Sequence, residues 1–179
     1  MRLLSPKEID RILALGRMLS DQEITTILDE FQEEQPEIYR AIYGEPSDDI
    51  AEQDPEMASL YLELCFDIIW IYRRAFGKPP KPLNKEQWVL DSLTLLDAEL
   101  KSLCDDMPMN EVFRSTLQQR LIQRSIEAGI QTELIQHLER EVQNYASFKR
   151  QRRSAIDITR NWLFVFVRLM DDLYSKKKA

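Results

Sequence analysis

Four carboxylates lie on the two most apolar segments of the chain, where their spacing could serve metal chemistry. Glu63 and Asp67 are four residues apart, so on a helix both would project from one face. Asp171 and Asp172 lie near the end of the other segment. Carboxylates on facing helices can hold Mg²⁺ against a substrate phosphate. One hypothesis is therefore a magnesium-dependent hydrolase of a phosphorylated small molecule; otherwise no cofactor is expected.

Two charged residues interrupt these same segments. Asp67 lies within Leu64–Tyr72, and Arg168 lies within Phe166–Met170. A buried charge costs on the order of several kcal/mol unless it is paired. We therefore expect Asp67 to form a buried ion pair with Arg168, or with Arg74 on its own segment. The alternative is that each charged group reaches solvent at the edge of an apolar face.

Basic residues gather toward the end of the chain. The cluster that could bind an anion is Lys149, Arg150, Arg152 and Arg153. As a nucleic-acid site it predicts binding that weakens with salt and is lost when its arginines become glutamate. The alternative is that these residues form a solvated helix end, where cations favour the helix dipole.

Other catalytic signatures are missing from the sequence. His137 is the only histidine, so no site that needs two can form, and the two cysteines, Cys65 and Cys104, do not form a C-x-x-C pair. The four glycines are never clustered, which excludes the known phosphate-cradling loops. Because Glu133 and Glu141 flank His137, we expect a surface histidine with a raised pKa.

The elements that must position these residues are helices. Capping boxes occur at Ser5–Glu8 and Ser20–Glu23, and Asp54 with Pro55 opens the most apolar helix, which ends at Phe76. Strand signals are nearly missing, and even Trp162–Val167, with its strand-like composition, is interpreted as helix. Helices are predicted to start near Ser5, Ser20, Pro36, Asp54, Asn84, Glu111, after Gly129 and near Ile158.

The predicted fold is an all-α bundle of about seven or eight helices, with residues 1–179 forming one domain. The segment Glu45–Asp54 holds five acids and is expected to be an exposed loop. Lys78–Pro82 contains three prolines and cannot continue a helix. A joint between two helical subdomains is therefore possible at residues 77–84.

Net charge and hydropathy limit the possible functions further. The net charge is −7, and residues 1–60 carry 15 acids and 5 bases, whereas residues 121–179 carry 7 acids and 11 bases. An acidic chain is repelled by nucleic acid, which argues against the nucleic-acid-associated alternative. The longest apolar run is six residues, so no membrane span is expected, and the beginning of the chain does not resemble a signal peptide.

By elimination, the sequence favours a cytoplasmic, non-catalytic protein that works as an adaptor or regulator. Its expected partner is another protein or a second copy of itself. An exposed remainder of the aromatic stripe Phe66, Trp70, Tyr72 and Phe76 would provide a groove for a partner helix.

Overall fold

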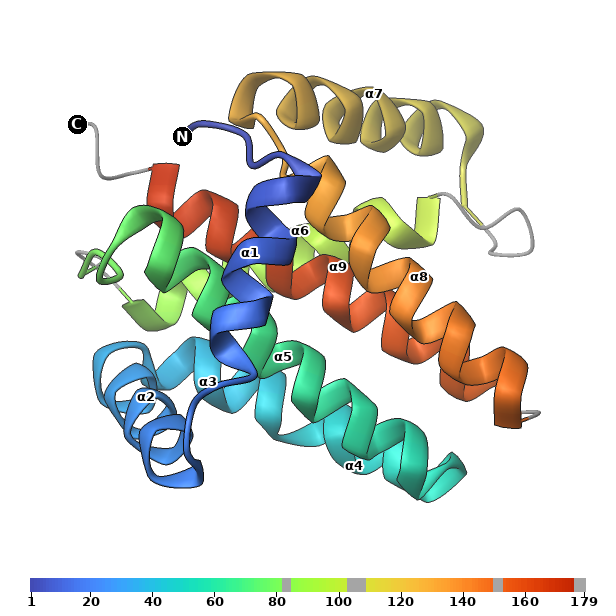
Figure 1. Cartoon of the computed structure of the whole chain (residues 1–179). Coiled ribbons are helices and arrows are strands. Elements are labelled where there is room, and N and C mark those ends of the chain that lie inside the picture. The colour runs from blue at the N-terminus through green and yellow to red at the C-terminus, as the bar shows by residue number, and fades with distance from the viewer. Residues whose placement is uncertain (82–84, 103–108, 150–152, 176–179) are drawn as a thin grey trace.

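The chain is helical throughout the part that its structure, a computed structural model, describes. That part comprises residues 1–81, 85–102, 109–149 and 153–175, with all of their side chains except those of 85, 124–128, 148 and 149. Nine α-helices and no strand occur in these ranges (Figure 1), which confirms the all-α prediction. The helices are α1 (Pro6–Gly16), α2 (Asp21–Glu34), α3 (Pro36–Tyr43), α4 (Glu45–Gln53), α5 (Pro55–Phe76), α6 (Lys85–Ser102), α7 (Glu111–Ala128), α8 (Thr132–Lys149) and α9 (Arg153–Ser175).

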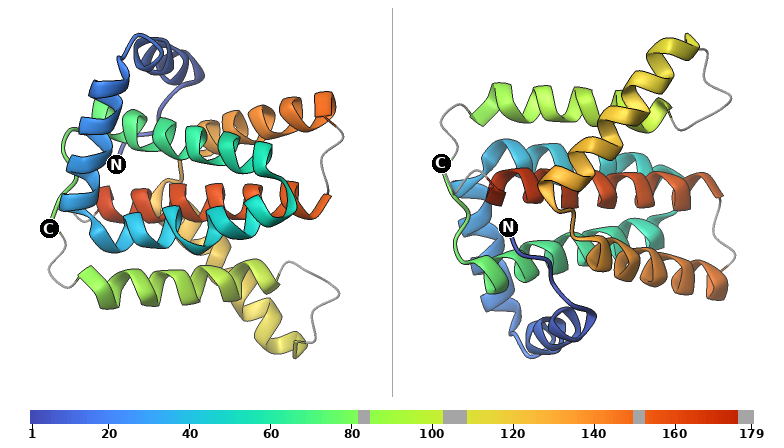
Figure 2. Two further views of the ribbon diagram at one scale, coloured as in Figure 1. Left: turned by 90° about the horizontal axis from the view of Figure 1, so that it is seen from below. Right: turned by 90° about the horizontal axis from the view of Figure 1, so that it is seen from above.

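The centre of the fold is the pair of helices α5 and α9, which run side by side in the same direction (Figures 1 and 2). Their last turns meet in an aromatic cluster, where the ring centroids of Tyr72, Phe76 and Tyr174 lie 5.4 to 5.8 Å apart. Helices α1 and α4 pack against α5, and α8 and α6 pack against α9. The most apolar helix of the described chain, α5, is thus enclosed by the others together with α9.

Three of the predicted helix starts are formed by the expected caps, at Ser5, Ser20 and Asp54. The Glu8 carboxylate accepts a hydrogen bond from the Ser5 N–H at 3.0 Å, and the Glu23 carboxylate accepts one from the Ser20 N–H at 2.8 Å. Asp54 Oδ1 accepts hydrogen bonds from two N–H groups in the first turn of α5. These carboxylates stabilise backbone donors that have no partner inside the helix. By contrast, α9 begins at Arg153 and not near Ile158, and Asn84 lies outside the described residues.

The prediction of an exposed loop over Glu45–Asp54 is wrong, because this segment forms α4. Pro46 and Ile50 are buried, so the helix has an apolar face that the acidic composition concealed. Glu45 and Asp48 lie in its first turn, where carboxylates favour the helix dipole. This short helix explains why the described part contains one more helix than the sequence predicted.

The segment after α5 is extended over the residues that the structure describes. Gly77 has φ of 86°, a left-handed conformation that suits glycine and ends the helix. The Gly77 carbonyl accepts a hydrogen bond from the Tyr174 hydroxyl at 2.8 Å, and the Pro80 carbonyl accepts one from Gln35 Nε2 at 3.0 Å. Residues 82–84 lie outside the described part, so the proposed joint at 77–84 stays a prediction.

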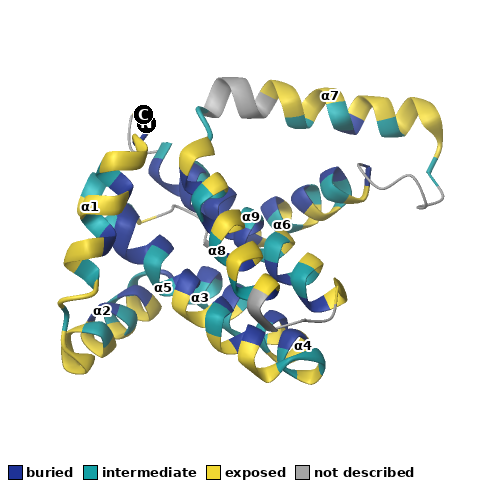
Figure 3. Cartoon of the chain, turned by 45° about the vertical axis from the view of Figure 1, so that its right-hand side comes forward, coloured by how far each residue is buried: buried dark blue, intermediate teal, exposed yellow. Residues whose placement is uncertain are grey.

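Helix α7 lies at the edge of the fold, as Figure 3 shows by its largely exposed surface. It packs against α6 and α9, and its Leu117 is buried, while Val112, Phe113 and Ile122 are exposed. No helix among the described residues is both long enough and apolar enough to cross a membrane.

One close approach between α1 and α5 gives a test of this packing. A Cβ atom on Gly16 would lie 2.9 Å from two atoms of the Trp70 indole, whose Nε1 donates a hydrogen bond to the Ile12 carbonyl at 2.8 Å. We expect Gly16→Ala to lower the free energy of unfolding by about 1 kcal/mol, because the overlap outweighs the better helix propensity of alanine. Urea unfolding followed by circular dichroism measures this change.

The matched control places Gly16→Ala in a Trp70→Ala background, which removes the whole indole and with it both atoms that the new methyl group would meet. There the substitution is expected to be neutral or stabilising. An equal loss of stability in both backgrounds would contradict the proposed contact.

Candidate functional site

The four carboxylates of the magnesium hypothesis do not come together. Glu63 is exposed and Asp67 half-buried on α5, whereas Asp171 is buried and Asp172 half-buried on α9. Among the described residues, no group of three or more histidine, cysteine, aspartate or glutamate side chains could hold a metal ion. The geometry therefore does not support a helical carboxylate site for Mg²⁺.

The buried ion pair predicted for Asp67 is not formed with either arginine. Arg74 is exposed, and its guanidinium lies 5.4 Å from the centroid of the Trp70 ring. Arg168 is fully buried, as expected, but the carboxyl group that it influences is that of Asp171, one helical turn away on α9. None of the guanidinium nitrogens of Arg168 has a hydrogen-bond partner among the described residues, so no ion pair accounts for its burial.

Asp67 lies instead among charged groups of three helices. Burial raises the pKa of Asp67 to about 6; the nearby Arg17, which caps the end of α1, opposes this shift, and Glu63 and Glu141 reinforce it. On α8, the prediction of a raised pKa for His137 is wrong. Burial of this half-exposed imidazole lowers its pKa and outweighs the effect of Glu141.

Asp171 is the centre of a buried hydrogen-bond cluster. Its Oδ1 accepts a hydrogen bond from the Tyr72 hydroxyl at 2.6 Å, and its Oδ2 accepts one from the Gln131 N–H at 3.2 Å. The Gln131 side chain in turn accepts from the Leu4 N–H at 2.8 Å and donates to the Arg2 carbonyl at 2.7 Å. The cluster thus joins α5, α9, the start of α8 and the beginning of the chain.

Burial has the largest effect on the pKa values of Asp171 and Tyr72 in this cluster. It raises the pKa of Asp171 to about 7, although Tyr72, Gln131 and Arg168 each favour the ionised form. Burial and the adjacent carboxylate also raise the pKa of Tyr72 well above its ordinary value. These groups are enclosed by the core and do not line a described cavity, so we assign them a structural role.

The predicted anion-binding cluster lies largely outside the described residues. Arg150, Arg152 and the side chain of Lys149 are not described. Arg153 begins α9, is 95% exposed, and its Nε lies 3.8 Å from a carboxylate oxygen of Asp157. Anion binding by this cluster stays a prediction.

An apolar groove follows one side of α6. Two adjoining cavities of about 570 and 460 Å³ lie between α6 and the rest of the bundle, and both are lined by Leu93 and Trp162. We call them together the α6 groove. Its other walls comprise Glu86, Val89, Leu90, Thr94, Asp97, Leu100 and Lys101 of α6, Glu37, Arg40 and Ala41 of α3, Gly44, Glu45 and Pro46, and Ile158, Asn161 and Val165 of α9.

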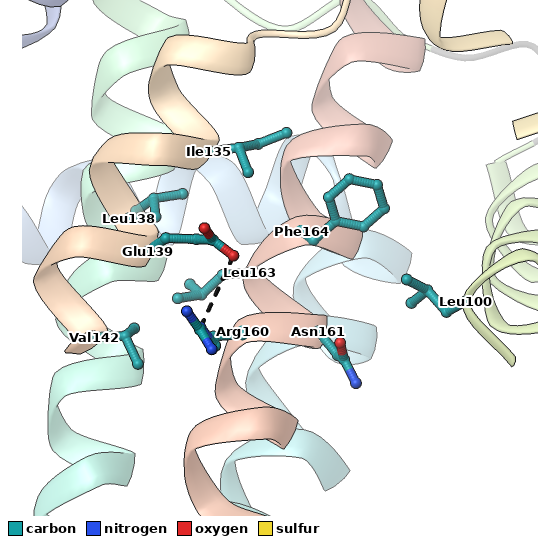
Figure 4. Close-up of a pocket in the computed structure, with 9 residues that line it drawn as sticks. All are labelled: Leu100, Ile135, Leu138, Glu139, Val142, Arg160, Asn161, Leu163 and Phe164. Atoms are coloured by element: carbon teal, nitrogen blue, oxygen red, sulfur yellow. Dashed lines mark ion pairs between the residues drawn. The ribbon is translucent and has the colours of Figure 1, made fainter. Parts of the chain in front are cut away.

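A third cavity, of about 210 Å³, adjoins the far end of the groove and shares Leu100 and Asn161 with it. Figure 4 shows Leu100 on one side of this cavity and side chains of α8 on the other. Between α8 and α9, Arg160 Nε lies 3.9 Å from a Glu139 carboxylate oxygen (Figure 4). The hollowed surface thus extends from the first turn of α6 to its last.

The groove is on α6, not on the aromatic stripe of α5 that the sequence suggested. In that stripe Trp70 and Tyr72 are buried in the core, while Phe66 and Phe76 are half-buried. Trp70 also lines a separate cavity of about 680 Å³ between α2 and α5, whose other walls are mainly polar. In α6, Leu90 is 57% exposed beside the groove. The sequence shows the apolar periodicity of α6. It does not show that a hollow would form between α6 and Trp162 of α9, because their spacing is set by contacts between residues far apart in the chain.

The chain matches no protein-family model, no curated protein and no solved structure.

The buried carboxyl group of Asp171 predicts how stability varies with pH. Its pKa is about 7 in the folded chain and 3.8 ordinarily, so between these values the folded state holds a proton that the unfolded state has lost. The contribution of Asp171 therefore favours folding at low pH and is lost as pH rises toward 7. We expect Asp171→Asn to reduce the fall in stability between pH 5 and pH 8, measured by urea unfolding.

Asp67→Asn is the matched control, because the pKa of Asp67 is raised only to about 6. Its effect should be complete at a lower pH than that of Asp171→Asn. An unchanged pH dependence in Asp171→Asn would contradict a proton on this carboxyl group in the folded chain.

Proposed function

We propose that this chain acts by binding another protein, as a non-catalytic adaptor or regulator, and that the partner docks in the α6 groove. The observation that carries the proposal is the continuous apolar hollow along α6, in which Leu93 and Trp162 line both main cavities. Amphipathic helices bind other proteins by laying an apolar face into such a groove.

The dimensions of the groove support a helical occupant. Its α6 wall extends from Glu86 to Lys101, which at 1.5 Å per residue is about 22 Å, or roughly four helical turns. The partly exposed Leu90 at its edge would be covered by the partner, and Trp162 is a side chain of the type that dominates binding energy at interfaces. The floor of the groove is apolar along its length. It has few polar groups that could form hydrogen bonds to orient a small substrate.

The proposal names a different protein, rather than a second copy, as the partner. The flanks of the groove carry more acidic than basic side chains, so a second copy would need to present its own basic surface there. The cytoplasmic location expected from the sequence accords with such a role and is part of the proposal.

Site-specific photocrosslinking tests the proposal in the cells that produce the protein. With p-benzoylphenylalanine in place of Leu90, we expect one crosslinked product with a second protein, because the probe would face the bound partner. The matched control is the same probe at Met18, in the turn after α1, which is 81% exposed and does not line the groove. No partner-specific product is expected there.

A second substitution separates binding from accidental proximity. Trp162→Ala should reduce the Leu90 crosslink several-fold, since it removes one of the two side chains that line both cavities. Circular dichroism checks that the variant stays helical. Equal products at Leu90 and Met18, or no product at Leu90, would refute docking at the groove. A product of two copies of this chain would make the groove a homo-oligomer interface instead.

A further inference from the structure

We infer that the occupant of the α6 groove is a basic amphipathic helix, whose lysines or arginines lie toward the end of the groove formed by α3 and α4. This inference rests on the proposed function and specifies the chemistry of the partner. It follows from the distribution of charge along the two flanks of the groove.

The end of the groove near α3 and α4 is acidic. Glu45 and Glu86 are exposed, line this end, and make no ion pair among the described residues. A third acid, Glu37, is paired with Arg40 at 2.7 Å. Two carboxylates are therefore available to a partner.

Helix dipoles do not cancel this charge. Glu45 and Glu86 lie in the first turns of α4 and α6, where each helix N-terminus contributes roughly half a positive charge. About one net negative charge is left by this pair, and the exposed Asp48 and Asp49 of α4 add to it. The local field thus favours a cationic partner.

The opposite end of the groove is balanced. Lys101 Nζ lies 2.6 Å from an Asp97 carboxylate oxygen, and Arg160 is paired with Glu139 beside the adjoining cavity. Each charge there has a counter-charge from the chain itself. A partner helix with basic residues at one end would therefore bind in one direction only.

The apolar part of the partner follows from the length of the floor. Over roughly four turns, a helix presents large side chains at positions i, i+3 or i+4, i+7 and i+11 on one face. Such a face would cover Leu90, Leu93 and Trp162, while its basic flank would lie beside Glu45 and Glu86. Electrostatic complementarity of this kind sets orientation and specificity more than total affinity.

The test is a selection from a phage-displayed library of helical peptides of about 16 residues, long enough to span the groove, on the full chain at low salt. We expect enriched peptides to combine apolar residues at helical spacing with lysine or arginine clustered toward one end. Their binding should be lost or strongly weakened with Leu90→Ala, which removes the exposed apolar side chain at the edge of the groove without changing the charge.

Charge-neutralised variants then measure the contribution of the acidic end. For an enriched synthetic peptide, we expect the double variant Glu45→Gln/Glu86→Gln to weaken binding about fivefold, and the difference to shrink at high salt. The matched control is Glu63→Gln/Glu133→Gln, which changes the net charge equally at two exposed sites that do not line the groove. It should leave the affinity unchanged.

The outcomes separate this inference from the proposed function. Enriched peptides that need Leu90 but show no basic bias, or are acidic, would overturn the basic partner and leave docking at the groove supported. The basic partner is likewise overturned if both double variants weaken binding equally. Failure to enrich any peptide whose binding depends on Leu90 would overturn the proposed function together with the inference.

Discussion

Burial of the parallel helices α5 and α9 is the constraint on which the rest of the structure depends. Each has a run of consecutive buried residues, Ile68–Tyr72 in α5 and Val165–Asp171 in α9, and such a run faces all sides of a helix, so other helices must cover both of them. The hydrogen bonds of Asp171 to Tyr72 and to the backbone of Gln131 fix the two helices relative to the start of α8. Because the Asp171 carboxyl group, the Tyr72 hydroxyl and the Gln131 N–H are hydrogen-bonded to one another, their burial does not carry the free-energy cost of unsatisfied polar groups.

The sequence predicted the helices because their signals are local. Capping residues such as Ser5, Ser20 and Asp54 act within a few residues of the N–H groups that they bind. The acidic composition of α4 misled for the same reason, since only tertiary contacts reveal that Pro46 and Ile50 are buried. Propensity and composition are weak guides when a short helix is held by its neighbours.

The functional residues were harder to predict because they depend on contacts far apart in the chain. Arg168 was correctly expected to be buried, but Tyr72 and Gln131 lie 99 and 40 residues from Asp171, and no spacing rule connects them. The α6 groove also joins distant segments, with Leu93 opposite Trp162. A protein-binding role could be reached by eliminating catalytic motifs, whereas the location of the surface required the arrangement of α3, α6 and α9.

Native mass spectrometry of the protein, purified gently at low salt from the cells that produce it, tests the protein-binding account most directly. We predict a complex of the 179-residue chain with a different protein in defined stoichiometry. A bare monomer, and above all one that retains a divalent metal ion, would contradict the account and return attention to the carboxylates.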